Sequence, residues 1–194
     1  MSDYSAQQLA ERAGISEWTL TARLAALGLT ARDRMALRAF VPLVEAEADG
    51  FLDGLYAQMG TVPELGAMLG GPAQVGRLKA LQRVYLRELF GAELDWDYVL
   101  SRVRIGAMHH RVGLTPQWFL VTYAHLVGGY VRLLFERAVT VEDGLAQVVT
   151  LLKTALFDAT VVLDSYGMAE EASIRERIAA SGEGLPRRTE AAEG

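Results

Sequence analysis

The sequence of 194 residues contains no cysteine, and this absence removes several chemistries at once. It excludes a disulfide scaffold, a thiolate nucleophile and every metal site that depends on cysteine sulfur. A metal ligand must therefore come from the three histidines, the carboxylates or the tyrosines.

Positive charge is also scarce, because 19 Lys and Arg face 24 Asp and Glu and give a formal net charge of -5. Nucleic acids and anionic membrane surfaces attract basic proteins, so neither is expected as a general partner. The N-terminus has no basic segment followed by an apolar run, as a secretory signal would, and a cytoplasmic location is expected.

One stretch, residues 112–131, contains no Asp, Glu, Lys or Arg over about the length of a membrane span. Pro116, Gly128 and Gly129 interrupt it, and nothing comparable follows. The pattern favours a buried helix in a soluble core, and no membrane partner is expected.

No segment shows the sustained alternation of apolar and polar residues that marks a strand, so the sequence predicts an all-α protein. Capping residues, glycines and prolines divide the helices. We expect helices over residues 16–27, 30–60, 75–91, 95–113, 116–137 and 140–170, with a short helical turn after Pro63. Residues 1–15 are expected to form an N-terminal arm, and residues 172–194 a polar tail or a truncated linker.

Two adjacent histidines, His109 and His110, stand late in the predicted helix 95–113. A neutral imidazole is the commonest side-chain metal ligand, yet a histidine on a mixed helix is more often a surface or core residue. His125 lies on the next helix and is expected to be a core histidine with a satisfied interhelical hydrogen bond.

The string around the histidines is more specific. RIGAMHHRVGLTPQW, residues 104–118, has the pattern Arg-Ile-Gly-x-x-His-x-x-x-Gly-Leu followed by Pro-x-Trp, and it resembles the proximal haem segment of the globin-coupled sensor family. Residues 27–44, 51–59, 78–90 and 94–106 resemble other segments of that family. The resemblance implies a globin fold in its sensor variant, with an extra N-terminal helix and no D helix, over residues 16–171.

The same resemblance implies a site. His109, four residues before Gly113, would be the proximal ligand of the iron of haem b, and His110 would lie on the rim. Tyr56, 53 positions earlier, would be the distal tyrosine that donates a hydrogen bond to bound dioxygen, with CO or NO as other ligands. The remaining expected haem contacts are Leu55, Leu78, Leu81, Gln82, Leu86, Ile105, Val112, Trp118 and Phe119.

Two positions depart from the family pattern. Leu81 is apolar where some members carry a second polar distal residue, so the distal side would depend on Tyr56 unless Gln82 turns inward. Phe119 stands where relatives usually carry tyrosine, and a proximal hydroxyl relay through that position is therefore absent.

The resemblance also implies a homodimer in which the last two helices of each copy form a four-helix bundle. The expected surface consists of Gly128, Gly129, Leu133, Leu145, Val148, Leu152 and Val161. No catalytic motif is recognised, so an enzyme is not expected, and the output module or partner protein stays unknown.

Two alternatives remain open. Residues 9–27 resemble a helix-turn-helix, which would make the protein a ligand-responsive transcription regulator. Two features weaken that alternative: the recognition helix would present Glu17 toward phosphate, and Glu11 adds to the acidic charge of a segment with few bases. The second alternative is a globin-like sensor that has lost haem and responds to a fatty acid or another protein.

Overall fold

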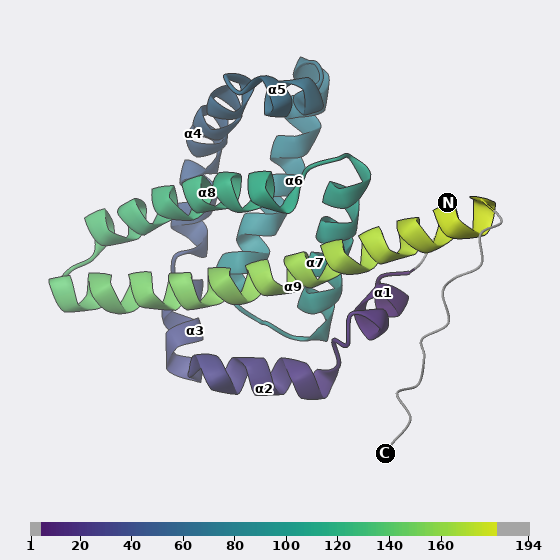
Figure 1. The fold of residues 1–194 in the computed structure, drawn as a ribbon. Helices are drawn as coiled ribbons and strands as arrows, with labels where there is room; N and C mark the ends of the chain where they lie inside the picture. Colours follow the sequence, from purple (N-terminus) through teal and green to yellow (C-terminus); the bar gives the residue numbers. More distant parts are fainter. Residues whose placement is uncertain (1–4, 182–194) are drawn as a thin grey trace.

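The computed structural model describes residues 5–181, and all regular structure within them is α-helical (Figure 1). The all-α prediction is confirmed. The helices are α1 (Ala6–Arg12), α2 (Glu17–Leu27), α3 (Ala31–Arg38), α4 (Val41–Gly60), α5 (Pro63–Leu69), α6 (Pro72–Gly91), α7 (Trp96–Arg111), α8 (Pro116–Arg137) and α9 (Val141–Ser181).

The two longest helices organise the fold. Helices α8 and α9 run side by side in opposite directions, and α4, α6 and α7 cross them steeply (Figure 1). The main core, which includes Leu52, Leu86 and Leu134, fills the space among α4, α6, α8 and α9. A second core joins α1 and α2 to α7 and α9.

The predicted helix over residues 30–60 is divided in two, and this expectation is corrected. Helix α3 ends at Arg38, and α4 begins at Val41 with Pro42 in its first turn. A proline inside a continuous helix would remove a hydrogen bond and clash with the preceding turn, whereas the first turn tolerates it. A new helix, α4, therefore begins one residue before Pro42.

Both ends of the described chain contain more helix than expected. In the expected N-terminal arm, Ser5 and Gln8 form a capping box that starts α1, and Leu9 and Ala10 pack into the second core. Helix α9 continues past residue 171 to Ser181, since the polar segment is rich in good helix formers such as Ala, Glu and Arg. Residues 1–4 and 182–194 lie outside the described part of the chain.

Two helices are long and apolar enough to cross a membrane by length and composition alone. One is α8, and the other is the Val141–Met168 stretch of α9, so the expectation that nothing comparable follows residue 131 is wrong. Both pack against each other and against the main core, and core helices of soluble proteins pass the same test.

A buried ion pair joins α7 to α9. Arg102 and Asp158 are both fully buried, and the guanidinium Nε of Arg102 donates to the carboxylate of Asp158. The hydroxyls of Tyr85 and Tyr98 donate to the same carboxylate, and Tyr123 approaches it at 3.4 Å. Burial raises the pKa of all three phenols well above the ordinary value, so they stay protonated and remain donors.

The same arginine also contacts α6. Its guanidinium carbon lies 4.4 Å from the ring centre of Tyr85 and 3.9 Å from that of Tyr98. Its terminal nitrogen also pairs with Glu88, which accepts a hydrogen bond from Ser101 at 2.9 Å. We call Arg102, Asp158, Tyr85, Tyr98 and Tyr123 the buried charge cluster, and it ties α6, α7 and α8 to α9.

Close to this cluster, Gly106 lets α7 and α9 approach each other. A methyl group at Gly106 would overlap the side chain of Ser165 and the carbonyl of Val162. Gly54, on the exposed side of α4, has nothing within 4 Å of the same position. The glycine of the Arg-Ile-Gly motif is therefore required by helix packing.

We predict that Gly106→Ala destabilises the protein by about 1–3 kcal/mol, because the added methyl group forces the two helices apart. Gly54→Ala is the matched control and should stabilise by about 0.5–1 kcal/mol, because alanine favours an exposed helix interior. Chemical denaturation measures both. Equal effects of the two substitutions would show that α7 and α9 do not cross at Gly106.

Candidate functional site

Helix α7 carries His109 in its last turn, and both ends of this helix are fixed. The side chain of Asp95 accepts a hydrogen bond from the backbone N–H of Tyr98 at 2.9 Å. At the other end Gly113, with φ of 79°, reverses the chain, and the N–H of Leu114 donates to the carbonyl of His109 at 3.0 Å. Gly113 therefore serves the turn, and Gly106 allows the close approach.

The imidazole of His109 is half-buried between two aromatic rings. Its ring centre lies 5.6 Å from that of Phe119 on α8 and 6.4 Å from that of Tyr166 on α9. Its Nδ1 atom is buried and has no hydrogen-bond partner within residues 5–181. Burial lowers the pKa of His109 to about 4, so the imidazole is neutral at physiological pH and presents a lone pair to a metal.

The other two histidines lack this combination. His110 is half-buried, and its ring meets the edge of Tyr166 at a centroid distance of 6.5 Å. His125 is exposed on α8, and no hydrogen bond joins it to another described residue, so the expectation of a core histidine at this position is wrong. An exposed side chain is satisfied by water instead.

Tyr56 stands on α4 and packs, half-buried, against the main core. Burial raises the pKa of Tyr56 to about 12, so its phenol is a protonated donor at neutral pH. Its hydroxyl makes no hydrogen bond to any described residue, and neither a hydrogen bond nor a ring contact joins it to His109.

The structure distributes the other predicted contacts unevenly. Leu55, Leu86 and Phe119 are buried in the main core, and Ile105 packs against it. Leu78, Gln82 and Trp118 are half-buried. Leu81 and Val112 are 67% and 55% exposed, and Val112 lies just beyond the end of α7. That each of these residues contacts haem remains a prediction.

The helices of the two site residues belong to different packing units. Helix α6 is joined to α4 by three ion pairs between residues four apart on each helix, namely Asp53–Lys79, Asp49–Arg83 and Glu45–Arg87. Helix α7 packs most extensively on α9, and α6 and α7 make few close backbone contacts. Tyr56 therefore belongs to the α4–α6 unit, and His109 to the α7–α9 unit.

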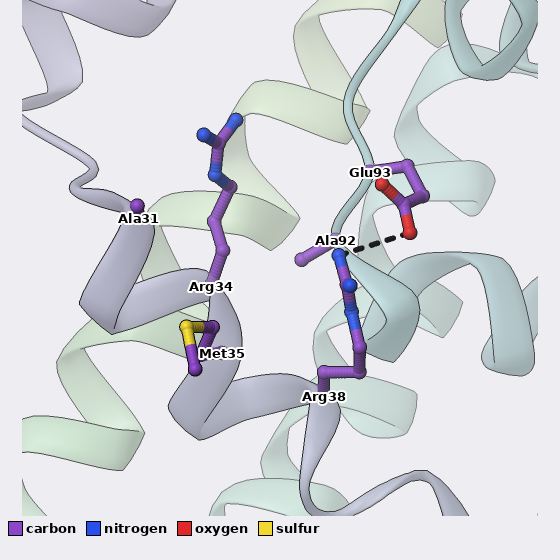
Figure 2. A pocket seen from close by; sticks show the side chains of 6 residues that line it. All are labelled: Ala31, Arg34, Met35, Arg38, Ala92 and Glu93. Atoms are coloured by element: carbon purple, nitrogen blue, oxygen red, sulfur yellow. Dashed lines mark ion pairs between the residues drawn. The ribbon is translucent and has the colours of Figure 1, made fainter.

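A hollow elsewhere is not this site. It measures about 200 Å³ and lies between α3 and the segment that follows α6 (Figure 2). Arg34 and Arg38 project toward it, and Arg38 pairs with Glu93 at 2.9 Å. None of the predicted site residues lines it.

The donor set limits the kind of metal that the protein could hold. Among the described residues no group of three or more His, Asp or Glu side chains could hold a metal ion. A single neutral imidazole binds a bare divalent ion weakly, whereas it suffices for an iron whose other ligands come from a macrocycle. His109 and its surroundings therefore fit haem better than a free ion.

Comparison with known proteins identifies the family. The protoglobin family model matches residues 16–172, so the chain belongs to the protoglobin family. The chain is 30% identical over 168 residues to the heme-based aerotactic transducer HemAT of Halobacterium salinarum, covering 81% of this chain and 34% of that protein. It thus spans about a third of the length of this relative.

A solved structure confirms the fold. The globin domain of a globin-coupled sensor from Geobacter sulfurreducens superposes with a TM-score of 0.71 at 20% identity, covering 75% of this chain and 96% of that one. The globin fold and the resemblance to sensor globins predicted from the sequence are both confirmed.

Sequence reasoning missed two features that the structure brings to the site. One is the buried charge cluster, although a lone acid in the apolar stretch 151–163 marks Asp158 as unusual. The other is Tyr166, which no motif singled out and which packs against both His109 and His110.

Proposed function

We propose that this protein is a haem-based gas sensor in which His109 holds the iron and dioxygen is the ligand, with CO or NO as alternatives. The observation that carries the proposal is the neutral, half-buried imidazole of His109, whose Nδ1 has no partner among the described residues. Membership of the protoglobin family and the similarity to a heme-based transducer support it.

When bound, haem b would supply the ferrous iron at which a diatomic gas is taken up. The protein's own residues would do the rest. His109 would bind the iron through Nε2, Ile105 and Phe119 would exclude water around the imidazole, and Tyr56 would donate a hydrogen bond to the gas. Because Tyr56 and His109 belong to different packing units, the ligand would act between the α4–α6 and α7–α9 units.

We expect the protein to act as a sensor without catalytic activity of its own. The output module or partner stays unknown, and the cytoplasmic location stays a prediction. The helix-turn-helix alternative is disfavoured, because Leu20 and Ile15 are buried in the second core and Arg23 pairs with Asp164 at 2.7 Å. The apolar side of that segment and the guanidinium of Arg23 are therefore used in contacts within the fold.

A homodimer through α8 and α9 is also part of the proposal. Apolar side chains along the outer face of these helices are exposed, namely Leu120, Val121, Phe135, Leu145, Val149, Leu152 and Leu156. Beside them lies a groove of about 430 Å³ between α8 and α9. Exposed apolar surface of this extent on two packed helices is typical of a subunit interface.

The expectation is wrong for three of the residues assigned to that interface. Val161 is buried in the second core, Leu133 packs against the main core, and Gly129 lies under the ring of Phe51. Helical periodicity alone could not separate the inward face from the outward face of helices that are apolar on both.

The first prediction of this proposal separates the two adjacent histidines. The purified protein should bind added haemin and show a Soret band, and His109→Ala should abolish stable binding. His110→Ala is the matched control and should retain the band. The reverse result would assign the iron to His110, and a wild-type protein that takes up no haemin would favour the haem-free alternative.

The second prediction concerns Tyr56. Tyr56→Phe keeps the ring and removes the one donor, so dioxygen should dissociate about ten times faster or more. Stopped-flow displacement by CO measures the rate, and CO dissociation itself should change much less. An unchanged dioxygen rate would assign Tyr56 to core packing only.

The third prediction concerns assembly. The wild-type protein should sediment at twice 21.2 kDa, and Leu156→Glu should give monomers, because a buried carboxylate is costly in an apolar interface. Met35→Glu, at an equally exposed apolar residue on α3, should leave the dimer intact. A monomeric wild-type protein, or equal effects of both variants, would contradict the proposed interface.

A further inference from the structure

Two buried polar atoms without partners lie on neighbouring side chains. They are Nδ1 of His109 and the phenol oxygen of Tyr166, and neither forms a hydrogen bond within the described residues. Buried polar atoms are almost always paired, and leaving one unpaired costs about 1–3 kcal/mol. Two such atoms on adjacent rings therefore call for a common explanation.

The surroundings offer few other partners. The rings of His109 and Tyr166 are 6.4 Å apart between centres and tilted by 37°. Phe119 completes the group at 5.6 Å from His109 and 6.2 Å from Tyr166, but it has no hydrogen-bonding atom. His110 presents its ring at right angles to Tyr166 at 6.5 Å.

Tyr166 is itself well fixed on α9. Its side chain is 4% exposed and belongs to the main core. It lies one residue beyond Ser165, which is the side chain that Gly106 of α7 allows to come close. The approach of α7 to α9 at Gly106 thus also brings the His109 imidazole to the Tyr166 ring.

We propose that Tyr166 is a positioning residue for His109, with its phenol oxygen accepting a hydrogen bond from Nδ1–H when Nε2 holds the iron. The proposal rests on the proposed function. One hydrogen bond between these two atoms would give each of them a partner. The bond fixes the tautomer and orientation of the imidazole and makes it a stronger ligand, as outer partners of metal-bound histidines do.

This contact has a consequence for sensing. Because residue 119 is phenylalanine, α8 presents no hydroxyl at this position beside His109. Tyr166 supplies one from α9 instead. A displacement of His109 would then be transmitted directly to α9, which carries part of the proposed dimer face. Tyr166 also reaches the buried charge cluster through Phe119, whose ring stacks on that of Tyr123 at 5.4 Å.

The test compares Tyr166→Phe with Tyr130→Phe. Tyr130 is also buried with an unpartnered hydroxyl, but its ring packs on Phe51 at 4.7 Å and Phe90 at 5.2 Å, away from His109. Each substitution removes one hydroxyl and keeps the ring. Tyr166→Phe should accelerate haem loss about ten- to a hundredfold and lower the iron–histidine stretching frequency of the ferrous protein, while Tyr130→Phe should change neither.

The outcomes separate this inference from the function it rests on. If the wild-type protein takes up haem and Tyr166→Phe behaves like Tyr130→Phe, the positioning role is wrong and the proposed function stands. If the wild-type protein takes up no haem, both are wrong.

Discussion

The ion pair between Arg102 and Asp158 is the interaction on which the rest of the structure depends. A charge without contact with water is tolerated only when its partner and its remaining hydrogen bonds are supplied, and here phenol donors supply them. Because these partners come from α6, α7 and α8, the requirement to satisfy one carboxylate on α9 fixes four helices relative to one another. If any of these helices shifted, a buried charge would lose a partner inside an apolar core.

The position of His109 follows from this constraint. Arg102 and His109 lie two helical turns apart on α7, with Gly106 between them at the contact with α9. The cluster and the glycine together hold the last turn of α7 against Tyr166 and Phe119. On the distal side, three ion pairs hold α4 and α6 together, and α6 meets α7 chiefly through the contacts of Arg102 with Tyr85 and Glu88.

Much of this could be predicted from the sequence, and the missing parts share a physical cause. Caps and breakers such as Thr30, Asp95 and Gly113 act locally, so the ends of most helices followed from them. The motif around His109 identified the family, but the cluster depends on residues up to 73 positions apart, and no local pattern reveals that they meet. Val161 and Gly129 were misplaced for the same reason, since only packing decides which face of an apolar helix is buried.

The central claim is that Asp158 holds the α7–α9 framework that carries His109, and the most direct measurement is the free energy of unfolding of Asp158→Asn against Asp164→Asn. Asp164 lies on the same helix and pairs with Arg23, but at the half-exposed edge. Removing the buried charge should cost about 3–5 kcal/mol, because Arg102 loses its buried counter-charge. The control should cost less than about 1 kcal/mol. Equal losses for the two variants would contradict the account.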